Sequence, residues 1–372
     1  MRKRTRPRNT RRSADWVDGV CCKKIGLRRA LLTWFRKCAR DLPWRRSKNP
    51  YRIWVSEIML QQTRIDTVLP YFQRFIQSFP NVQALASAKE DRVLKQWEGL
   101  GYYRRAFNLQ KTARIIVHEY GGRFPKTVEE WRRLPGVGRY TAGAVTSIAF
   151  DVQTPVLDGN IKRILARLFK IQKCVDDGST IRDLWTAVEE LVPAKHPGDF
   201  NQAMMELGSR ICTPKRPLCD ECPVTKLCDA RAMDCVEDFP VRQPKQRIPH
   251  YDIVAAAIRK NGRYLLGKRP PGGMLSGLWE FPGGKVEQGE TREQALVREL
   301  EEEIGITIRV DSHITSVDHT YSHFKISLHL YECEIIGGKP QAKYHSEVKW
   351  ILRSQFDRYA FPAADLKFFD RL

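Results

Sequence analysis

The sequence predicts a chain of two domains, an all-α domain followed by a smaller α+β domain. Between Leu27 and Arg231, apolar residues recur at spacings of three and four, the period of an amphipathic helix, and short turn segments separate these runs. From Tyr251 onward the pattern changes to strand-forming runs around one strongly helical run. Residues 236–250, rich in Pro, Gln and basic residues without periodicity, indicate a linker between the two domains.

Length and charge agree with this division and indicate a polyanionic partner. A chain of 372 residues is long enough to bury more than one core. Its net charge of +21 favours nucleic acid as the partner, although basic solvated surfaces also occur without any ligand. No apolar run approaches the length of a membrane span, and no apolar segment typical of an export signal follows the basic N-terminus. We therefore expect a soluble, unexported protein without a membrane partner.

Cysteine usage indicates a reducing compartment. The chain has ten cysteines, four of them clustered with metal-ligand spacing and the others scattered. Cytoplasmic localisation is expected, nucleoid-associated in a bacterium, while a nuclear or organellar location stays open.

The N-terminal segment, residues 1–27, is expected to be an arm that is disordered until it meets a polyanion. The first 28 residues carry ten Lys or Arg against two Asp and show no apolar periodicity. A DNA-contacting arm and a targeting address are both compatible with this composition. Cys21 and Cys22, near its end, have no evident role.

A single carboxylate, Glu57, stands in an apolar helical run, residues 55–63. A lone Glu on a helix is solvated in most cases. However, Ile58, Met59 and Leu60 follow it directly, and a carboxyl group half-buried among them would have a raised pKa and could carry a proton at neutral pH.

Residues 97–105 combine two glycines, an apolar residue, two tyrosines and two arginines. Simple packing explains many aromatic pairs of this kind. Beside a DNA duplex, the same residues could insert into the base stack while the arginines hold phosphates.

A glycine-rich turn, Leu134-Pro135-Gly136-Val137-Gly138, lies between two helical runs. Such a turn often only connects two packed helices. It also bares backbone N–H groups at the start of the next helix, an arrangement that binds phosphate. Asp158 follows as a lone carboxylate further along the same stretch.

Four cysteines are separated by gaps of six, two and five residues: Cys212, Cys219, Cys222 and Cys228. Four thiolates at this spacing suit either a tetrahedral zinc ion or a [4Fe–4S] cluster, and spacing alone does not distinguish them. Lys215 and Arg216, in the first gap, would present positive charge to a DNA phosphate.

The helical run of the C-terminal domain carries a cluster of acidic residues. Glu299, Glu302 and Glu303 share one face of this helix, downstream of Gly284 and Glu290. Carboxylates clustered in this way suit Mg²⁺ bound to a diphosphate, although a Glu-rich amphipathic helix is usually only a solvated face.

Together the motifs of residues 28–235 resemble the helix-hairpin-helix DNA glycosylases, and among these the MutY family of A/G-specific adenine glycosylases. The resemblance rests on VSEIMLQQT, WEGLGYY, LPGVGRYTAGAV, LDGN and the cysteine spacing. It implies a six-helix barrel, a [4Fe–4S] domain and an adenine-accepting pocket. Duplex DNA containing adenine opposite 8-oxoguanine is the implied partner, and the protein is expected to be a monomer.

The resemblance assigns roles to individual residues. Glu57 is the acid that protonates the flipped adenine, and Asp158 stabilises the sugar cation or traps it transiently. Tyr140 and Asn160 are the hydrogen-bonding pair around them. Because endonuclease III-type glycosylases have a lysine where this chain has Tyr140, base removal without strand cleavage is expected. The predicted DNA contacts are Gln62, Tyr102, Leu134, Gly136, Gly138, Lys215 and Arg216.

Residues 251–372 resemble the Nudix hydrolases of the MutT type, with a complete Nudix box. In adenine glycosylases this domain commonly has a decayed box and only recognises 8-oxoguanine. Tyr321, Ser322 and His323 resemble the loop that does so, with Ser322 as the hydrogen-bonding residue. Tyr344 stands where many Nudix enzymes have another Glu, and Asp365 where MutT-type enzymes read the base.

Three functional hypotheses follow. The leading one is a base-excision repair enzyme that removes adenine mispaired with 8-oxoguanine or G. The second adds Mg²⁺-dependent hydrolysis of 8-oxo-dGTP or a related oxidised nucleotide at the intact box. The third, a DNA-binding protein that has lost catalysis, is disfavoured by the presence of both Glu57 and Asp158.

Overall fold

The computed structural model describes residues 15–244 and 247–372, and within them it confirms an all-α region followed by an α+β domain. Contacts group the chain into two compact units that do not follow the sequence order. Unit 1 comprises Met1–Ile58 and Phe124–Lys245, and unit 2 comprises Met59–Arg123 and Gln246–Leu372.

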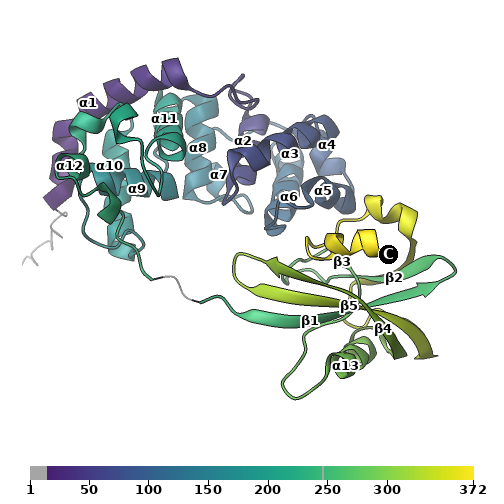
Figure 1. Ribbon diagram of the computed structural model, residues 1–372. Helices are drawn as coiled ribbons and strands as arrows, with labels where there is room; N and C mark the ends of the chain where they lie inside the picture. Colours follow the sequence, from purple (N-terminus) through teal and green to yellow (C-terminus); the bar gives the residue numbers. More distant parts are fainter. Residues whose placement is uncertain (1–14, 245–246) are drawn as a thin grey trace, which may run out of the picture. The chain divides into compact units, whose positions relative to one another are not determined.

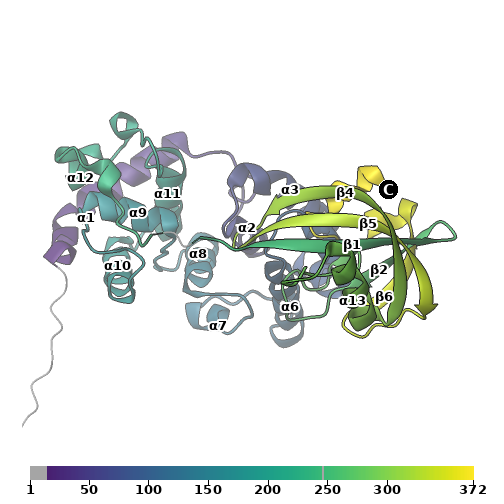
Figure 2. The ribbon, with the colours of Figure 1, turned by 60° about the horizontal axis from the view of Figure 1, so that its bottom comes forward.

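Unit 1 is a bundle of helices (Figure 2), and most of them share one hydrophobic core. Helix α11 contacts α1, α8 and α9, so it lies at the centre of the packing. Short 3-10 turns at Cys219–Glu221, Thr225–Leu227 and Val236–Asp238 connect the segments near its end. Its helices are α1 (Asp15–Cys38), most of α2 (Pro50–Leu60), α7 (Val128–Arg132), α8 (Arg139–Phe150), α9 (Gly159–Leu168), α10 (Gly178–Leu191), α11 (Pro197–Arg210) and α12 (Asp229–Ala232).

The expectation of a disordered arm over residues 1–27 is wrong for its second half, because α1 begins at Asp15. Val20, Leu27 and Leu31 lie on one face of this helix and are buried in the core of unit 1. Few apolar residues occur in this segment, and basic residues are interspersed among them. The sequence pattern therefore did not indicate a helix here. Residues 1–14 lie outside the described residues.

The helical part of unit 2 consists of α3 (Ile65–Ser78), α4 (Val82–Ser87), α5 (Glu90–Trp97) and α6 (Arg104–Glu119). Helix α6 packs on both α4 and α5. The largest side chains buried here are aromatic, namely Phe72, Phe75, Phe79 and Trp97.

The α+β domain is built on a mixed six-stranded sheet with the order β3-β2-β1-β5-β4, and β6 pairs with β2. Strands β1 and β5 run parallel, and the other pairs are antiparallel. The strands are β1 (His250–Lys260), β2 (Arg263–Lys268), β3 (Trp279–Glu280), β4 (Ile306–Thr320), β5 (Lys325–Gly338) and β6 (Glu347–Leu352).

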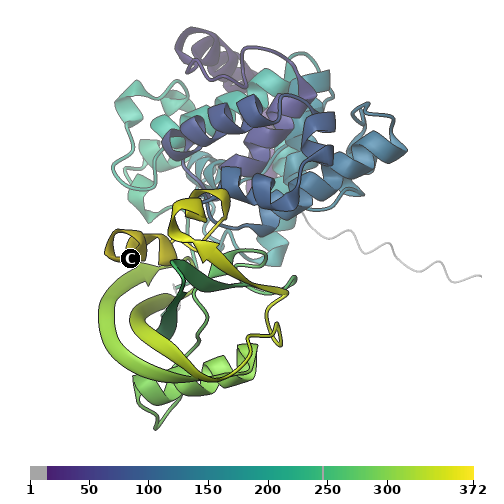
Figure 3. The ribbon, with the colours of Figure 1, turned by 90° about the vertical axis from the view of Figure 1, so that its right-hand side faces the viewer.

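Helical segments cover both faces of this sheet. Helix α13 (Arg292–Ile304) packs Leu296, Leu300 and Ile304 against one face. The C-terminal 3-10 helices, Arg353–Arg358 and Asp365–Arg371, cover the other face. Figures 1 and 3 show α13 and the C-terminal segment on opposite sides of the curved sheet. Within the described residues, no helix is both long and apolar enough to cross a lipid bilayer.

Candidate active site

Four predicted catalytic residues of unit 1 come from three helices that meet in its interior. Glu57 lies on α2, Tyr140 in the first turn of α8, and Asp158 and Asn160 at the start of α9. The Tyr140 hydroxyl donates a hydrogen bond to Glu57 Oε2 at 2.8 Å. Asp158 is the N-cap of α9 and accepts from the Ile161 N–H at 2.7 Å and from Asn160 Nδ2 at 2.9 Å. The structure therefore joins these residues into two hydrogen-bonded pairs.

The two carboxyl groups occupy different electrostatic surroundings. Burial raises the pKa of Glu57 to about 7, the Tyr140 hydrogen bond opposes this shift, and the negative charge of Asp158 adds to it. Burial also raises the pKa of Asp158, but hydrogen bonds from Ile161 and Asn160 favour its ionised form. Burial and the two carboxylates hold the pKa of Tyr140 well above its usual range, so its hydroxyl keeps the proton. Glu57 is thus suited to carry a proton, and Asp158 to carry a charge.

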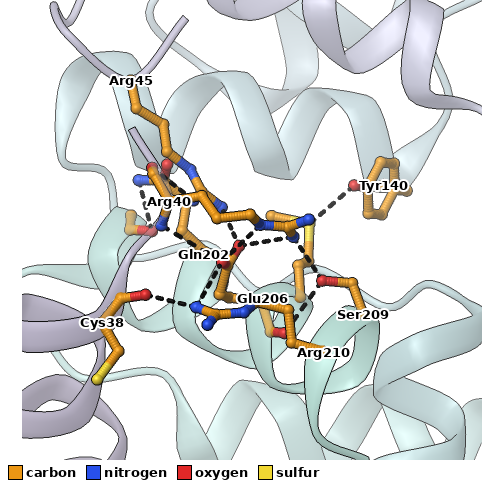
Figure 4. Close-up of polar contacts among 10 residues, drawn as sticks. Cys38, Arg40, Arg45, Tyr140, Gln202, Glu206, Ser209 and Arg210 are labelled. Atoms are coloured by element: carbon orange, nitrogen blue, oxygen red, sulfur yellow. Dashed lines mark hydrogen bonds and ion pairs between the residues drawn. The ribbon is translucent and has the colours of Figure 1, made fainter. Parts of the chain in front are cut away.

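Helix α11 supports Tyr140 through a network that the sequence did not reveal (Figure 4). Met205 Sδ lies 3.0 Å from the Tyr140 hydroxyl. The next residue, Glu206, has a fully buried side chain that binds Arg40 Nε at 2.7 Å and Arg45 Nη2 at 2.9 Å. Burial alone would raise its pKa, but Arg40 and Arg45 outweigh that effect and hold the pKa of Glu206 below its usual range.

Arg210 completes this network. Its Nη1 donates to the Cys38 carbonyl at 2.6 Å and lies 3.5 Å from Glu206 Oε1. One buried carboxylate thus fastens the segment after α1 to the helix beside Tyr140. A buried ion pair of this kind depends on residues far apart in sequence, and no spacing rule would have found it.

Close packing fixes Asn160. Arg163 Nη2 donates to Asn160 Oδ1 at 2.9 Å and to the Gly208 carbonyl at 2.7 Å. A Cβ at Gly208 would stand 2.5 Å from the Asn160 Cβ, so only glycine lets α11 approach so closely. The orientation of the Asn160 amide, and through it that of Asp158, follows from these contacts.

The four predicted cluster ligands lie together in the segment that follows α11. Cys212, Cys219, Cys222 and Cys228 all pack against the core of unit 1. Among the described residues, no three His, Cys, Asp or Glu side chains are drawn together as they would be around a single metal ion.

Arg167, which the sequence did not single out, organises this segment. Its guanidinium is buried and donates to Cys212 Sγ at 3.3 Å and to the Thr213 carbonyl at 2.7 Å. N–H donors to thiolate sulfur stabilise iron–sulfur clusters, so this donor set fits such a group. Lys215 and Arg216 are exposed on the loop that Arg167 supports.

We expect Cys222→Ser to lose the iron and the brown colour, because a hydroxyl is a much poorer iron ligand than a thiolate. The measurements are the iron content and the absorbance near about 400 nm, where thiolate–iron charge transfer is expected. Cys235→Ser is the matched control, since Cys235 packs against the same core but lies outside the motif. Stoichiometric zinc in a colourless wild-type protein would contradict the prediction.

The predicted glycine turn joins α7 to α8 as a helix-hairpin-helix. Leu134 is buried and anchors the turn, Gly136 has a positive φ of 73°, and Gly138 is the N-cap of α8. No side chain caps this helix end, and both Gly136 and Gly138 are exposed. The turn therefore presents a helix N-terminus to solvent, as a phosphate contact requires.

In unit 2, the predicted lesion loop and two predicted DNA-contacting residues line one cavity of about 1200 Å³. Gln62 and Tyr102, both with positive φ, border it together with Tyr321, Ser322 and His323. The rings of Tyr102 and His323 meet edge to face at 6.3 Å. Ser322 is exposed, so its hydroxyl is accessible from the cavity.

The acidic residues of the box are only partly brought together. Burial and the negative charges of Glu280 and Glu299 raise the pKa of Glu303 to about 8. Glu302 is 62% exposed and pairs with Arg298 at 3.4 Å. Arg298 also binds Glu290 at 2.8 Å, so much of the box is an internal ion-pair network.

Four further residues of this domain bear on the box. The extra carboxylate beside Glu303 is Glu280, which the sequence did not single out, and the buried His345 lies 3.2 Å from it. Tyr344, which precedes His345 in the sequence, is exposed. Asp365 is buried, and its burial raises its pKa well above the usual range.

Comparison with known proteins agrees with this arrangement. Residues 55–190 match the HhH-GPD superfamily of base excision DNA repair proteins, residues 212–228 the iron-sulfur binding domain of endonuclease III, and residues 253–371 the NUDIX domain. The adenine DNA glycosylase of Rattus norvegicus is 36% identical over 92% of this chain and 77% of its own length. That of Homo sapiens is 37% identical over 92% of this chain and 73% of its own length.

A solved structure of a thermostable thymine-DNA glycosylase is also similar, with 30% identity and a TM-score of 0.53. It covers 58% of this chain and 100% of its own chain. The predicted fold classes, the iron–sulfur cofactor and the resemblance to DNA glycosylases are thereby confirmed. The chain belongs to the adenine DNA glycosylase (MutY-type) family of base-excision repair enzymes, with a [4Fe–4S] domain and a C-terminal NUDIX-like domain.

Proposed function

We propose that this adenine glycosylase hydrolyses the N-glycosidic bond of adenine placed opposite 8-oxoguanine, or opposite G, in duplex DNA. The observation that carries the proposal is the pair of carboxyl groups in unlike surroundings: Glu57 is buried, accepts a hydrogen bond from Tyr140 and has its pKa raised to about 7, whereas Asp158 accepts hydrogen bonds from Ile161 and Asn160. Loss of a purine needs a proton on the leaving base and a negative charge beside the sugar. Glu57 and Asp158 supply these two requirements.

In this mechanism, adenine first leaves the base stack, at a cost of about a few kcal/mol. Glu57 donates its proton to the adenine ring as the bond from C1′ to N9 breaks, and the electron pair departs with the base. Asp158 stabilises the sugar cation, and water then adds to C1′ and gives its proton to the Glu57 carboxylate, which regenerates the acid. Tyr140 holds the Glu57 carboxyl, while Asn160 holds Asp158 through the 2.9 Å hydrogen bond.

Tyr140 also supports hydrolysis without strand cleavage. A lyase of this superfamily needs an amine that attacks C1′ and forms a Schiff base. The Tyr140 hydroxyl keeps its proton, because burial and the two neighbouring carboxylates raise its pKa. We therefore propose a monofunctional enzyme, whose product is an intact strand with an abasic site.

Exposed groups of unit 1 support the proposed hold on the DNA backbone. The N-terminus of α8, bared by Gly136 and Gly138, offers N–H donors to one phosphate. The exposed Lys215 and Arg216 offer charge to another. The buried side chain of Leu134 anchors the turn.

The cavity of unit 2 supports a role in reading the lesion. Its lining includes the exposed Arg104 and Lys111, which suit a polyanion, whereas Lys268 and Arg269 are paired with carboxylates. In the proposal, Gln62 and Tyr102 fill the space that the adenine vacates, and Ser322 reads 8-oxoguanine between Tyr321 and His323.

Incubation with duplex containing adenine opposite 8-oxoguanine, followed by hot alkali, should break the strand at the adenine. Ser322→Ala should lower the preference for 8-oxoguanine over G by about tenfold, the worth of one base-reading hydrogen bond. Ser312→Ala, on β4 outside the cavity, is the control. The absence of any break at adenine in the wild type would overturn the proposed substrate.

Nucleotide hydrolysis at Glu299, Glu302 and Glu303 stays a prediction from the motif, and the comparisons favour the glycosylase. Carboxylate oxygens are the donors that Mg²⁺ prefers, and they would hold it against a diphosphate. A monomeric state and localisation with the chromosomal DNA are part of the proposal.

A further inference from the structure

One charged pair in unit 2 ties helix α5 to the backbone of the C-terminal domain. Glu98 directly follows α5, and its Oε1 accepts a hydrogen bond from the Phe361 N–H at 2.8 Å. Its Oε2 accepts from Lys95 Nζ at 2.7 Å, and the same Nζ donates to the Tyr359 carbonyl at 2.9 Å. The Lys95 and Glu98 side chains are 23% and 14% exposed, so water screens this pair only partly.

The surroundings of this pair form a close fit. Lys268 of β2 binds Asp91 of α5 at 2.6 Å. A Cβ at Gly277 would stand 2.7 Å from the Phe107 ring and 3.1 Å from Leu94. The contact is therefore a packed surface with two ion pairs on it, and differs from an isolated ion pair on a surface.

Glu98 also begins the loop that carries Tyr102, residues 98–103. Within this loop Gly99, Gly101 and Tyr102 all have positive φ, of 88°, 74° and 49°. A tyrosine in that region is uncommon and needs support from its surroundings.

One residue of the C-terminal domain holds both ends of this loop. The N–H of Phe361 donates to Glu98, and the carbonyl of Phe361 accepts from the Tyr103 hydroxyl at 3.4 Å. The same hydroxyl accepts from the Gly99 N–H at 3.1 Å. The shape of the loop thus depends on the position of Phe361.

Tyr102 meets the C-terminal domain a second time, inside the cavity. There its ring contacts His323, next to Ser322 of the lesion loop. The 98–103 loop is therefore held by Phe361 at its ends and touched by the lesion loop at its centre.

We propose that Glu98 is a positioning residue that makes adenine release depend on what the C-terminal domain binds. This inference rests on the proposed function. When 8-oxoguanine occupies the cavity, the domain stays seated on α5, and the Glu98 contact holds Tyr102 where it fills the vacated space. With G opposite the adenine, the C-terminal domain contributes less to adenine release, so loss of the Glu98 contact should have a smaller effect on that rate.

The test compares single-turnover adenine release from duplexes with A opposite 8-oxoguanine and A opposite G. Glu98→Ala should slow the first reaction about tenfold, the worth of one charge-assisted hydrogen bond, and change the second little. Glu98→Gln keeps an oxygen for the Phe361 N–H and should restore most of the ratio. Glu119→Gln, which changes an exposed carboxylate at the end of α6 outside the cavity, is the matched control.

The outcomes are distinguishable. An equal effect on both duplexes, or no effect, would overturn the role of Glu98. Should Glu98→Ala fail to fold, Lys95→Met decides, because it removes the donor to Glu98 and to Tyr359 and should shift the same ratio. A wild type that releases no adenine from either duplex would instead refute the proposed function.

Discussion

Asp158→Asn should slow adenine release by about a thousandfold or more, because it removes the negative charge beside the sugar cation while keeping the shape of the side chain. Asn caps helices about as well as Asp, so α9 should keep its start at this position. Single-turnover release from duplex with A opposite 8-oxoguanine is the measurement.

The geometry also predicts a modest stability cost for this variant. The oxygen of the substituted amide can accept from the Ile161 N–H, but the amide nitrogen would then face Asn160 Nδ2, which Arg163 holds in place. One hydrogen bond is lost, at about 1 kcal/mol. Retained cluster absorbance and retained duplex binding are the controls. A residual rate within tenfold of the wild type would show that Asp158 does not carry the charge.

The sequence was informative where the function requires particular residue types that lie close together in the sequence. The glycine turn from Leu134 to Gly138 and the cysteine spacing are local features, and the structure contains both of them. Glu57 is a different case, because its burial depends on helices distant in sequence. The three apolar residues that follow it were the only local sign.

The burial of two charged side chains, Glu206 and Arg167, could not be predicted. Glu206 and Arg167 lie in helical runs where a charged residue normally faces water. The burial of Glu206 depends on its contacts with Arg40 and Arg45. The burial of Arg167 depends on its contact with the segment that begins at Cys212. Only the three-dimensional packing brings these partners together.

The strand pattern was incomplete for a related reason. Strand β3 has two residues, which is too short for any periodicity, and β6 alternates weakly. Both are strands because β2 pairs with them. The expectation that residues 15–27 are disordered failed similarly, since a few apolar residues of α1 suffice when the rest of unit 1 covers them.

Glu57→Gln should slow adenine release by about a hundredfold or more, because an amide cannot donate the proton that the leaving base requires. The amide oxygen of this variant can still accept from the Tyr140 hydroxyl, so the local structure should persist. The pH profile separates an acid from a purely structural residue, since only an acid makes the wild-type rate follow its protonated fraction.

The sign of that profile follows from the raised pKa of Glu57, about 7. The protonated form is the active one, so the rate should hold at about pH 6 and fall roughly tenfold by about pH 8. On the acid side the rate should fall again once Asp158, whose pKa is also raised, takes up a proton and loses its charge. Because the two groups interact, the limbs report the pair. Glu57→Gln should abolish the basic limb, and a variant that kept it would place the acid elsewhere.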